Sequence, residues 1–355
     1  MSDFDFSLQF SSNRVIFGSG TRRLVGQQAE RLGMSNALVV STAEQQDMAA
    51  DVAEHLGTVR AALCPRAVMH TPKDITDLAM ADLARASANG IISVGGGSAI
   101  GLGKAVALRT GLPHLAVPTT YAGSEMTPIL GETKNGIKTT QRAPSILPAA
   151  TVYDVELTLG LPTTLSVTSG MNAMAHAVEA LYAQDGNPII SLMAQEAISN
   201  LMGALPLIHR YPQSIDGRCL ALQGAWLAGS CLGSVSMSIH HKLCHVLGGS
   251  FDLPHAETHT VMLPYVTGFV SDAVPQAMKR IQRAANLGDR SPAKAIQDLA
   301  RGCGAPTNLA QIGMNADQLD RAAELATLNP YWSPKPFDRE TIRHLLQNAF
   351  EGTTP

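Results

Sequence analysis

The chain has 355 residues, of which 45% are hydrophobic and 15% charged, and 26 basic against 29 acidic side chains give a formal net charge of −3. This composition excludes an intrinsically disordered chain, and the lack of a Lys/Arg run argues against a nucleic-acid groove. Five scattered cysteines without a C-x-x-C pair argue against a disulfide scaffold or a zinc ribbon. The length is consistent with two domains.

Neither the first ten residues nor the uncharged segment 219–239 predicts a membrane protein. The first ten residues carry two acids and no basic segment, so they do not resemble a signal peptide. The segment 219–239 is uncharged, but three glycines and four serines make it a better candidate for a helix buried in protein than for a membrane span. We therefore expect a cytoplasmic protein that binds no membrane.

In the first half of the chain, short apolar runs alternate with helical patterns. The runs 37–40, 91–94 and 114–117 predict buried strands, and the segments 74–88 and 98–109 predict helices. This alternation is typical of parallel βαβ units whose helices cover both faces of a sheet. Ligands of such sheets bind beyond the carboxyl ends of the strands.

From about residue 163 the strand signals end, and the sequence becomes rich in Ala, Leu and Met at helical spacing. The predicted helices are 166–184, 190–209, 217–247, 258–271, 274–287, 292–302, 316–328 and 338–350. We therefore predict an α/β dinucleotide-binding domain with a parallel sheet over residues 1–162. An all-helical catalytic domain is predicted over residues 163–355.

Glycines 95–97 and Ser98 follow the second predicted strand directly. Glycine lets the backbone turn tightly and approach a ligand, and the N-terminus of the following helix favours a phosphate. The G-x-G-x-x-G pattern fails because Ile100 replaces its last glycine, and the P-loop pattern fails at Ala105. A plain helix-capping turn is the alternative. The hydroxyl-rich segment 118–127 follows the next strand and is a weak signal by itself.

Two further segments carry polar residues at helical spacing. Asn172 and His176 lie four residues apart and so share a helix face. Five histidines, at 240, 241, 245, 255 and 259, fall within twenty residues. Such a concentration predicts a metal centre or a proton-handling pocket, although the zinc-protease pattern H-E-x-x-H is not met.

Four segments together resemble the iron-containing alcohol dehydrogenase superfamily over almost the full length: GGGSAIGLGK (95–104), PTTYAGSEMT (118–127), SGMNAMAHAVEA (169–180) and HHKLCHVLGGSFDLPHAETHTVMLP (240–264). Within it, these variants look most like the maleylacetate reductases. The resemblance implies a dehydroquinate synthase-like fold, with the α/β and all-α domains described above.

The resemblance also implies a bound NADH or NADPH. Its pyrophosphate would be held by Gly95, Gly96, Gly97 and Ser98, and its ribose and nicotinamide side by Thr119, Thr120, Ser124 and Thr127. Lys138 is similar to a family lysine near the ribose. At the end of the first predicted strand, Thr42 stands in a stretch without the acid that repels a 2′-phosphate, so we expect NADPH to be used beside NADH.

Metal-dependent members of the superfamily hold their ion with one Asp and three His. The corresponding residues here are Asn172, His176, His241 and His255, and His245 matches a further histidine beside the nicotinamide. A neutral amide thus replaces the anionic ligand, and we expect no metal, although three-His zinc sites exist.

The implied reaction is the reduction of the C=C bond of maleylacetate to 3-oxoadipate, in the degradation of aromatic compounds. Hydride addition beta to the ketone gives an enolate, which needs hydrogen-bond donors and then a proton. His241, His245 and His255 are the candidates for donor and acid, with His176 supporting; which one delivers the proton stays open. Asn172 and Tyr331 are expected to contact the small dicarboxylate. Lys335 follows Tyr331 in a segment that is equally consistent with a Pro-rich surface turn.

Three other functions remain open from the sequence. They are a metal-dependent alcohol dehydrogenase, an NAD-using lyase of the dehydroquinate-synthase type, and a dinucleotide-binding protein without catalysis. We expect no nucleic-acid partner. The low charge and long apolar helices are compatible with a homodimer.

Overall fold

The computed structural model describes residues 6–8, 13–134 and 137–355, with the side chains of residues 137 and 138 left out. The described residues form two compact units, one within 13–161 and one within 162–355, and residues 6–8 group with the second. The sequence placed this boundary between residues 162 and 163. Each unit is described by itself below.

The first unit is built on a six-stranded parallel sheet. Its strands are β1 (Arg14–Gly18), β2 (Asn36–Val40), β3 (Arg60–Cys64), β4 (Gly90–Gly95), β5 (His114–Pro118) and β8 (Ala150–Asp154). They lie in the order β1-β8-β5-β4-β2-β3, and every neighbouring pair is parallel. The predicted strands are confirmed as β2, β4 and β5, and so is the α/β class.

The sequence analysis missed β1, β3 and β8, as well as the antiparallel hairpin of β6 (Ile129–Lys134) and β7 (Ile137–Arg142). β1 and β3 lie at the two edges of the sheet and are only partly buried, so their apolar pattern is weak. Only strands covered on both faces show as continuous apolar runs.

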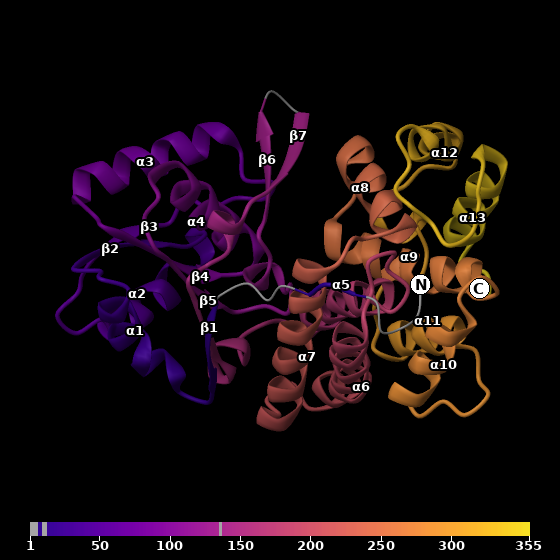
Figure 1. The fold of residues 1–355 in the computed structure, drawn as a ribbon, viewed down its shortest axis with the longest axis horizontal. Coiled ribbons are helices and arrows are strands. Elements are labelled where there is room, and N and C mark those ends of the chain that lie inside the picture. The colour runs from indigo at the N-terminus through magenta and orange to yellow at the C-terminus, as the bar shows by residue number, and fades with distance from the viewer. Residues whose placement is uncertain (1–5, 9–12, 135–136) are drawn as a thin grey trace. The chain divides into compact units, whose positions relative to one another are not determined.

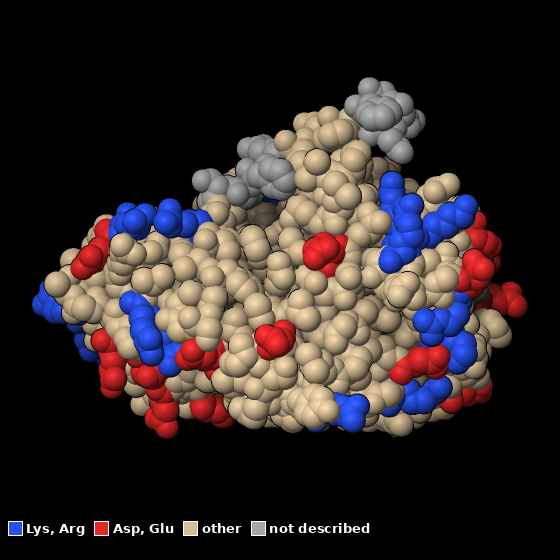
Figure 2. All heavy atoms as spheres, turned by 90° about the horizontal axis from the view of Figure 1, so that it is seen from below, with Lys and Arg blue, Asp and Glu red and all other residues tan. Residues whose placement is uncertain are grey.

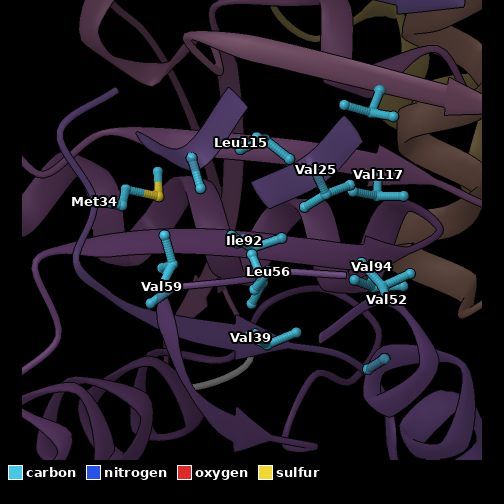
Figure 3. Close-up of a cluster of buried hydrophobic side chains, with 14 of the residues drawn as sticks. Val25, Met34, Val39, Val52, Leu56, Val59, Ile92, Val94, Leu115 and Val117 are labelled. Atoms are coloured by element: carbon cyan, nitrogen blue, oxygen red, sulfur yellow. The ribbon is translucent and has the colours of Figure 1, made fainter. Parts of the chain in front are cut away.

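Helices cover both faces of the sheet (Figure 1). α1 (Val25–Arg31) and α2 (Gln46–Glu54) pack on one face, and α3 (Lys73–Ala86) and α4 (Gly97–Thr110) pack on the other. Successive residues of a strand point to opposite faces. In β2, Val39 belongs to the cluster under α1 and α2 (Figure 3), whereas Leu38 and Val40 belong to the cluster under α3 and α4.

Gly103 brings α4 close to the sheet. A Cβ at this position would lie 2.0 Å from Ser93 Oγ and 2.6 Å from His114 Nε2, and these two buried side chains are themselves 2.7 Å apart. We expect Gly103→Ala to destabilise the first unit by about 1–3 kcal/mol through overpacking. Denaturant unfolding checks this, with Gly203→Ala as the control. Gly203 also lies in a helix but has no described atom within 4 Å of such a Cβ, and an unchanged midpoint for Gly103→Ala would contradict the packing argument.

The second unit is helical, as predicted. Its helices are α5 (Thr163–Ala180), α6 (Pro188–Arg210), α7 (Ile215–Ser234), α8 (Ile239–Phe251), α9 (His255–Val270), α10 (Pro275–Ala284), α11 (Pro292–Gly302), α12 (Leu319–Thr327) and α13 (Arg339–Glu351). α5, α6 and α7 pack on one another, and α9 packs on α5, α8 and α11.

One detail of the predicted helices is wrong. The single helix expected over 217–247 is divided into α7 and α8, which are bent by 98° at residues 235–238. α8 then continues through Gly248 and Gly249. α8 ends only at Asp252, whose φ of +55° is the left-handed conformation common at helix ends.

No single helix in the described part of the chain combines the length and hydropathy of a membrane span. α7 and α8 meet the criterion only as a bent pair. On the face seen in Figure 2, basic and acidic side chains are interspersed, and large areas carry neither.

Candidate active site

The sheet of the first unit has a topological switch point between β2 and β4. From β2 the chain passes through α2 to β3 on one side, and from β4 it passes through α4 to β5 on the other. Open α/β sheets bind ligands in the crevice that such a reversal leaves at the carboxyl ends of the strands. The glycines 95–97, Thr119 and Thr42 all follow strands at this edge.

The glycine turn leaves room for an anion at the start of α4. Gly95 has a φ of +143°, and a Cβ there would lie 2.5 Å from Gln45 Oε1. Gly97 opens α4 with no described atom within 4 Å of a Cβ position, and no side chain caps the helix. The first N–H groups of α4 therefore remain available to a phosphate. Ser98 is half-buried in the same turn.

The hydroxyl-rich segment is buried or half-buried at every position from 119 to 127. Thr119 is buried and accepts a hydrogen bond from Gln45 Nε2 at 2.9 Å. Thr120 is half-buried against Gly96. The Thr127 hydroxyl is buried and donates to the Ser124 carbonyl at 2.9 Å, so it shapes the loop rather than projecting from it.

Lys104, which the sequence analysis did not single out, fastens this loop to α4. Its buried ammonium group donates to the carbonyls of Ser124, Thr127 and Ile129 and to the Thr127 hydroxyl, at 2.5–3.0 Å. Burial lowers the pKa of Lys104, and the charge of the buried Glu125 opposes that effect. The glycine turn and the hydroxyl loop are thus parts of one connected structure.

An acidic residue that the sequence analysis did not consider, Glu44, lies shortly after the end of β2. Glu44 is exposed, and hydrogen bonds from its own backbone and from the Thr42 hydroxyl lower the pKa of its carboxyl group. A carboxylate here resembles the acids that hold ribose hydroxyls. Lys138 lies in β7, but its side chain is outside the described part of the structure.

In the second unit, one face of α5 carries three buried polar side chains. Asn172, His176 and Glu179 lie at positions i, i+4 and i+7 and are at most 4% exposed. The Asn172 Oδ1 atom is buried and has no hydrogen-bond partner among the described residues. This shared face places the amide predicted to contact substrate beside the first histidine.

His241 joins two residues of this face, His176 and Glu179, in a hydrogen-bonded chain. Its Nδ1 atom lies 2.5 Å from Glu179 Oε2, and its Nε2 atom lies 2.9 Å from His176 Nδ1. Burial acts to raise the pKa of Glu179, but the charge and hydrogen bond of His241, with those of neighbouring groups, outweigh it and the pKa is lowered. The carboxylate is therefore ionised, fixes the Nδ1–H tautomer of His241 and directs Nε2 toward His176.

Glu179 also explains the bend between α7 and α8. Its two oxygens accept hydrogen bonds from the backbone N–H groups of Ser238 at 3.0 Å and His240 at 2.8 Å. A carboxylate satisfies the unpaired donors and the positive dipole at a helix N-terminus. One buried acid thus starts α8 and orients the histidine that follows.

His245, His255 and Tyr331 are exposed, in contrast to the buried His176 and His241. His245 Nδ1 lies 3.2 Å from Tyr331 Oη. The predicted catalytic and substrate residues of this unit thus fall into two groups. The buried floor consists of Asn172, His176 and His241, and the exposed rim consists of His245, His255 and Tyr331. The ring of His255 packs against that of His259, with 4.5 Å between the ring centroids.

A second histidine pair lies beneath the floor. His240 Nε2 lies 2.9 Å from His259 Nδ1 and 3.6 Å from Cys244 Sγ, and in the described part of the chain only these three residues bring His, Cys, Asp or Glu donors close enough for a metal. Burial lowers the pKa of His240 to about 3, also lowers that of His259, and raises that of Cys244. All three are therefore neutral and support the rings above them.

The segment after Tyr331 does not offer free cations. Lys335 Nζ lies 2.9 Å from the Asp272 carboxylate, and Arg339 pairs with Asp320 at 3.1 Å. The alternative of a Pro-rich surface turn is therefore the better description of Lys335.

The donors at the implied metal position can be compared with what iron requires. Asn172 supplies a neutral amide oxygen, and His176, His241 and His255 supply neutral imidazoles. The Glu179 carboxylate is engaged by His241 Nδ1 and two backbone N–H groups. None of these four donors is anionic, so an iron(II) ion held by them would keep its full charge beside the buried Asn172, His176 and His241, which is costly.

Known proteins match the chain over nearly its full length. An iron-containing alcohol dehydrogenase model matches residues 12–155, and the C-terminal model of the Fe-containing alcohol dehydrogenase family matches residues 166–350. The maleylacetate reductase of Rhizobium sp. strain MTP-10005 is 52% identical over 342 residues, which cover 96% of this chain and 97% of that protein. The maleylacetate reductase of Sphingobium indicum is 50% identical and covers 96% of each chain. A crystal structure of the maleylacetate reductase from Agrobacterium tumefaciens matches with a TM-score of 0.95 at 50% identity, and covers 99% of each chain.

Proposed function

The chain belongs to the iron-containing alcohol dehydrogenase family of oxidoreductases, and we propose that it reduces the C=C bond of maleylacetate to 3-oxoadipate with NADH or NADPH. The observation that carries this proposal is the chain Glu179–His241–His176 beside Asn172, which offers protons where metal-dependent relatives hold an ion. The identity to maleylacetate reductases supports the choice of substrate.

The chemistry requires a hydride, an anion-stabilising donor and a proton. Bound NAD(P)H would supply the hydride to the carbon beta to the ketone. The electron pair of the C=C bond then moves onto the ketone oxygen as an enolate. A hydrogen-bond donor stabilises that oxygen, and a general acid adds a proton to the carbon alpha to the ketone, which completes the CH–CH bond.

His241 is the best-placed donor, because Glu179 holds a proton on its Nδ1 and stabilises the cationic ring. His176 lies at hydrogen-bond distance and can return a proton to His241 Nε2. The exposed His245 and His255 remain candidates for the acid at the alpha carbon. Asn172 offers an amide to the substrate, and Tyr331 lies beside His245.

For the coenzyme, the uncapped start of α4 and the open space at Gly97 suit a pyrophosphate. Glu44 beside Thr42 favours NADH more than the sequence alone suggested, while NADPH remains an expected second coenzyme. We further propose a cytoplasmic homodimer that acts on a small dicarboxylate and binds neither nucleic acid nor membrane. Light scattering coupled to gel filtration tests the dimer.

The decisive experiment is a steady-state assay of the metal-analysed protein with maleylacetate and NADH. We expect stoichiometric NADH consumption, formation of 3-oxoadipate and no loss of rate with a chelator. A preference for simple alcohols, with chelator-sensitive activity, would indicate a metal-dependent alcohol dehydrogenase instead. Turnover without net NADH consumption would indicate a lyase, and binding of NADH without any turnover would leave a binding protein.

Asn172→Asp tests the proposed independence from metal. Because Glu179 already orients His241, the new carboxylate would complete a ligand set of one acid and three imidazoles. We expect zinc or iron(II) affinity to rise at least about tenfold, and reduction of maleylacetate to fall, since the metal would occupy the imidazoles. Isothermal titration with the metal measures this. Equal affinity in Asn172→Asp and the parent protein would refute our account of residue 172.

A further inference from the structure

The proposed substrate is a dianion, whereas the buried floor of the site offers one amide and two imidazoles. Each carboxylate of such a substrate needs a cation or several donors to replace its water. Resting on the proposed function, we propose that Lys242 and the Tyr331 hydroxyl form the subsite that binds one substrate carboxylate and selects dicarboxylates over monocarboxylates.

The geometry places the two groups at the same histidine. Lys242 follows His241 on α8 and lies one turn before His245. Its Nζ atom is 5.7 Å from the centre of the Tyr331 ring, and the Tyr331 hydroxyl is 3.2 Å from His245 Nδ1. The ammonium group thus lies over the Tyr331 ring, and the hydroxyl of that ring lies beside His245, one turn after His241 on α8.

The charge of Lys242 is available to a ligand. Lys335 and Arg339, the other cations of the Tyr331 segment, are neutralised by Asp272 and Asp320. Within the described part of the chain, no acidic side chain forms an ion pair with Lys242. Its side chain is half-buried, so water screens its charge less than at an open surface. A carboxylate is the anion that would restore both the charge balance and the lost solvation.

Lys242→Met tests the subsite, because methionine keeps the length of the side chain and removes the charge. The substrates are maleylacetate and its two monoanionic analogues, 4-oxohex-2-enoate and 3-oxohex-4-enoate, each with one carboxylate replaced by methyl. We expect kcat/KM for maleylacetate to fall about 10- to 100-fold, the range for a lost charged hydrogen bond. For the analogue that lacks the recognised carboxylate it should change less than about threefold, since no contact is lost.

Controls separate this role from general damage. Lys279→Met removes a lysine from the exposed surface of α10, a helix that packs on α6 and α11, and should behave like the parent protein. Lys242→Arg should recover part of the preference for the dianion, and Tyr331→Phe should lose part of it. The KM for NADH should stay the same in every variant.

Three outcomes would overturn the inference. One is an unchanged preference for maleylacetate over both analogues in Lys242→Met. Another is an equal loss with all three substrates, which would make Lys242 a structural residue. A raised KM for NADH alone would assign Lys242 to a coenzyme phosphate. If the parent protein does not reduce maleylacetate, the proposed function itself fails, and the variant is not needed to show it.

Discussion

Replacing Glu179 with glutamine is expected to lower kcat for maleylacetate reduction by about 100-fold or more, with little change in the KM for NADH. The carboxylate accepts hydrogen bonds from Ser238 N, His240 N, His241 Nδ1 and the Tyr182 hydroxyl. An amide has only one accepting oxygen, so its NH₂ group would face at least one of these donors. His241 would lose both its anionic partner and its fixed tautomer.

The same change should also destabilise the fold by about 1–3 kcal/mol, since a buried donor is left without a partner. The solvent isotope effect on kcat separates the two effects: it should rise if proton delivery has become slower, and a purely structural change would leave it unaltered. Glu196→Gln, on the exposed surface of α6, is the matched control. A lower unfolding midpoint with an undiminished kcat would show that Glu179 stabilises the start of α8 but has no part in catalysis.

His241→Ala is expected to lower kcat by about 100- to 10,000-fold, the range for loss of a positioned proton donor. His255→Ala should also lower kcat strongly. In both variants the metal content of the purified protein should stay the same, because we propose that the imidazoles act without an ion. Added imidazole should recover part of the His241→Ala activity by entering the space next to Glu179.

The comparison for these variants is His209→Ala, which removes an exposed histidine of α6. Metal content that falls in parallel with activity would disprove the imidazole mechanism. Failure of imidazole to restore any activity, with the fold intact, would place the essential function of His241 in packing.

The bend between α7 and α8 shows why local sequence did not predict the helical unit completely. Residues 235–238 are uncharged and include neither glycine nor proline, so they are compatible with a continuing helix. The group that ends it is Glu179, which lies 59 residues before Ser238 and binds its N–H group. Periodicity reports local preference, whereas this break depends on a contact with α5 that only the folded chain forms.

The same distinction applies to the site. The spacing of Asn172 and His176 predicted their shared face, because helix geometry follows from the sequence alone. Glu179 continues that face three residues after His176, a signal that was present in the sequence and not used. The pairing of His241 with His176 joins α8 to α5, and no local pattern encodes it. The sequence alone did not indicate a role for Lys242, because its contact with Tyr331 joins two residues that are far apart in the chain.

The bonds from Lys104 have a consequence for the thermodynamics of coenzyme capture. Since one side chain of α4 holds the backbone of residues 124–129, the glycine turn after β4 and the hydroxyl-rich loop after β5 are already ordered relative to each other. An arriving dinucleotide would then lose its own freedom and some bound water, but would not have to immobilise a loop. Such preorganisation turns a larger share of the contact energy into affinity.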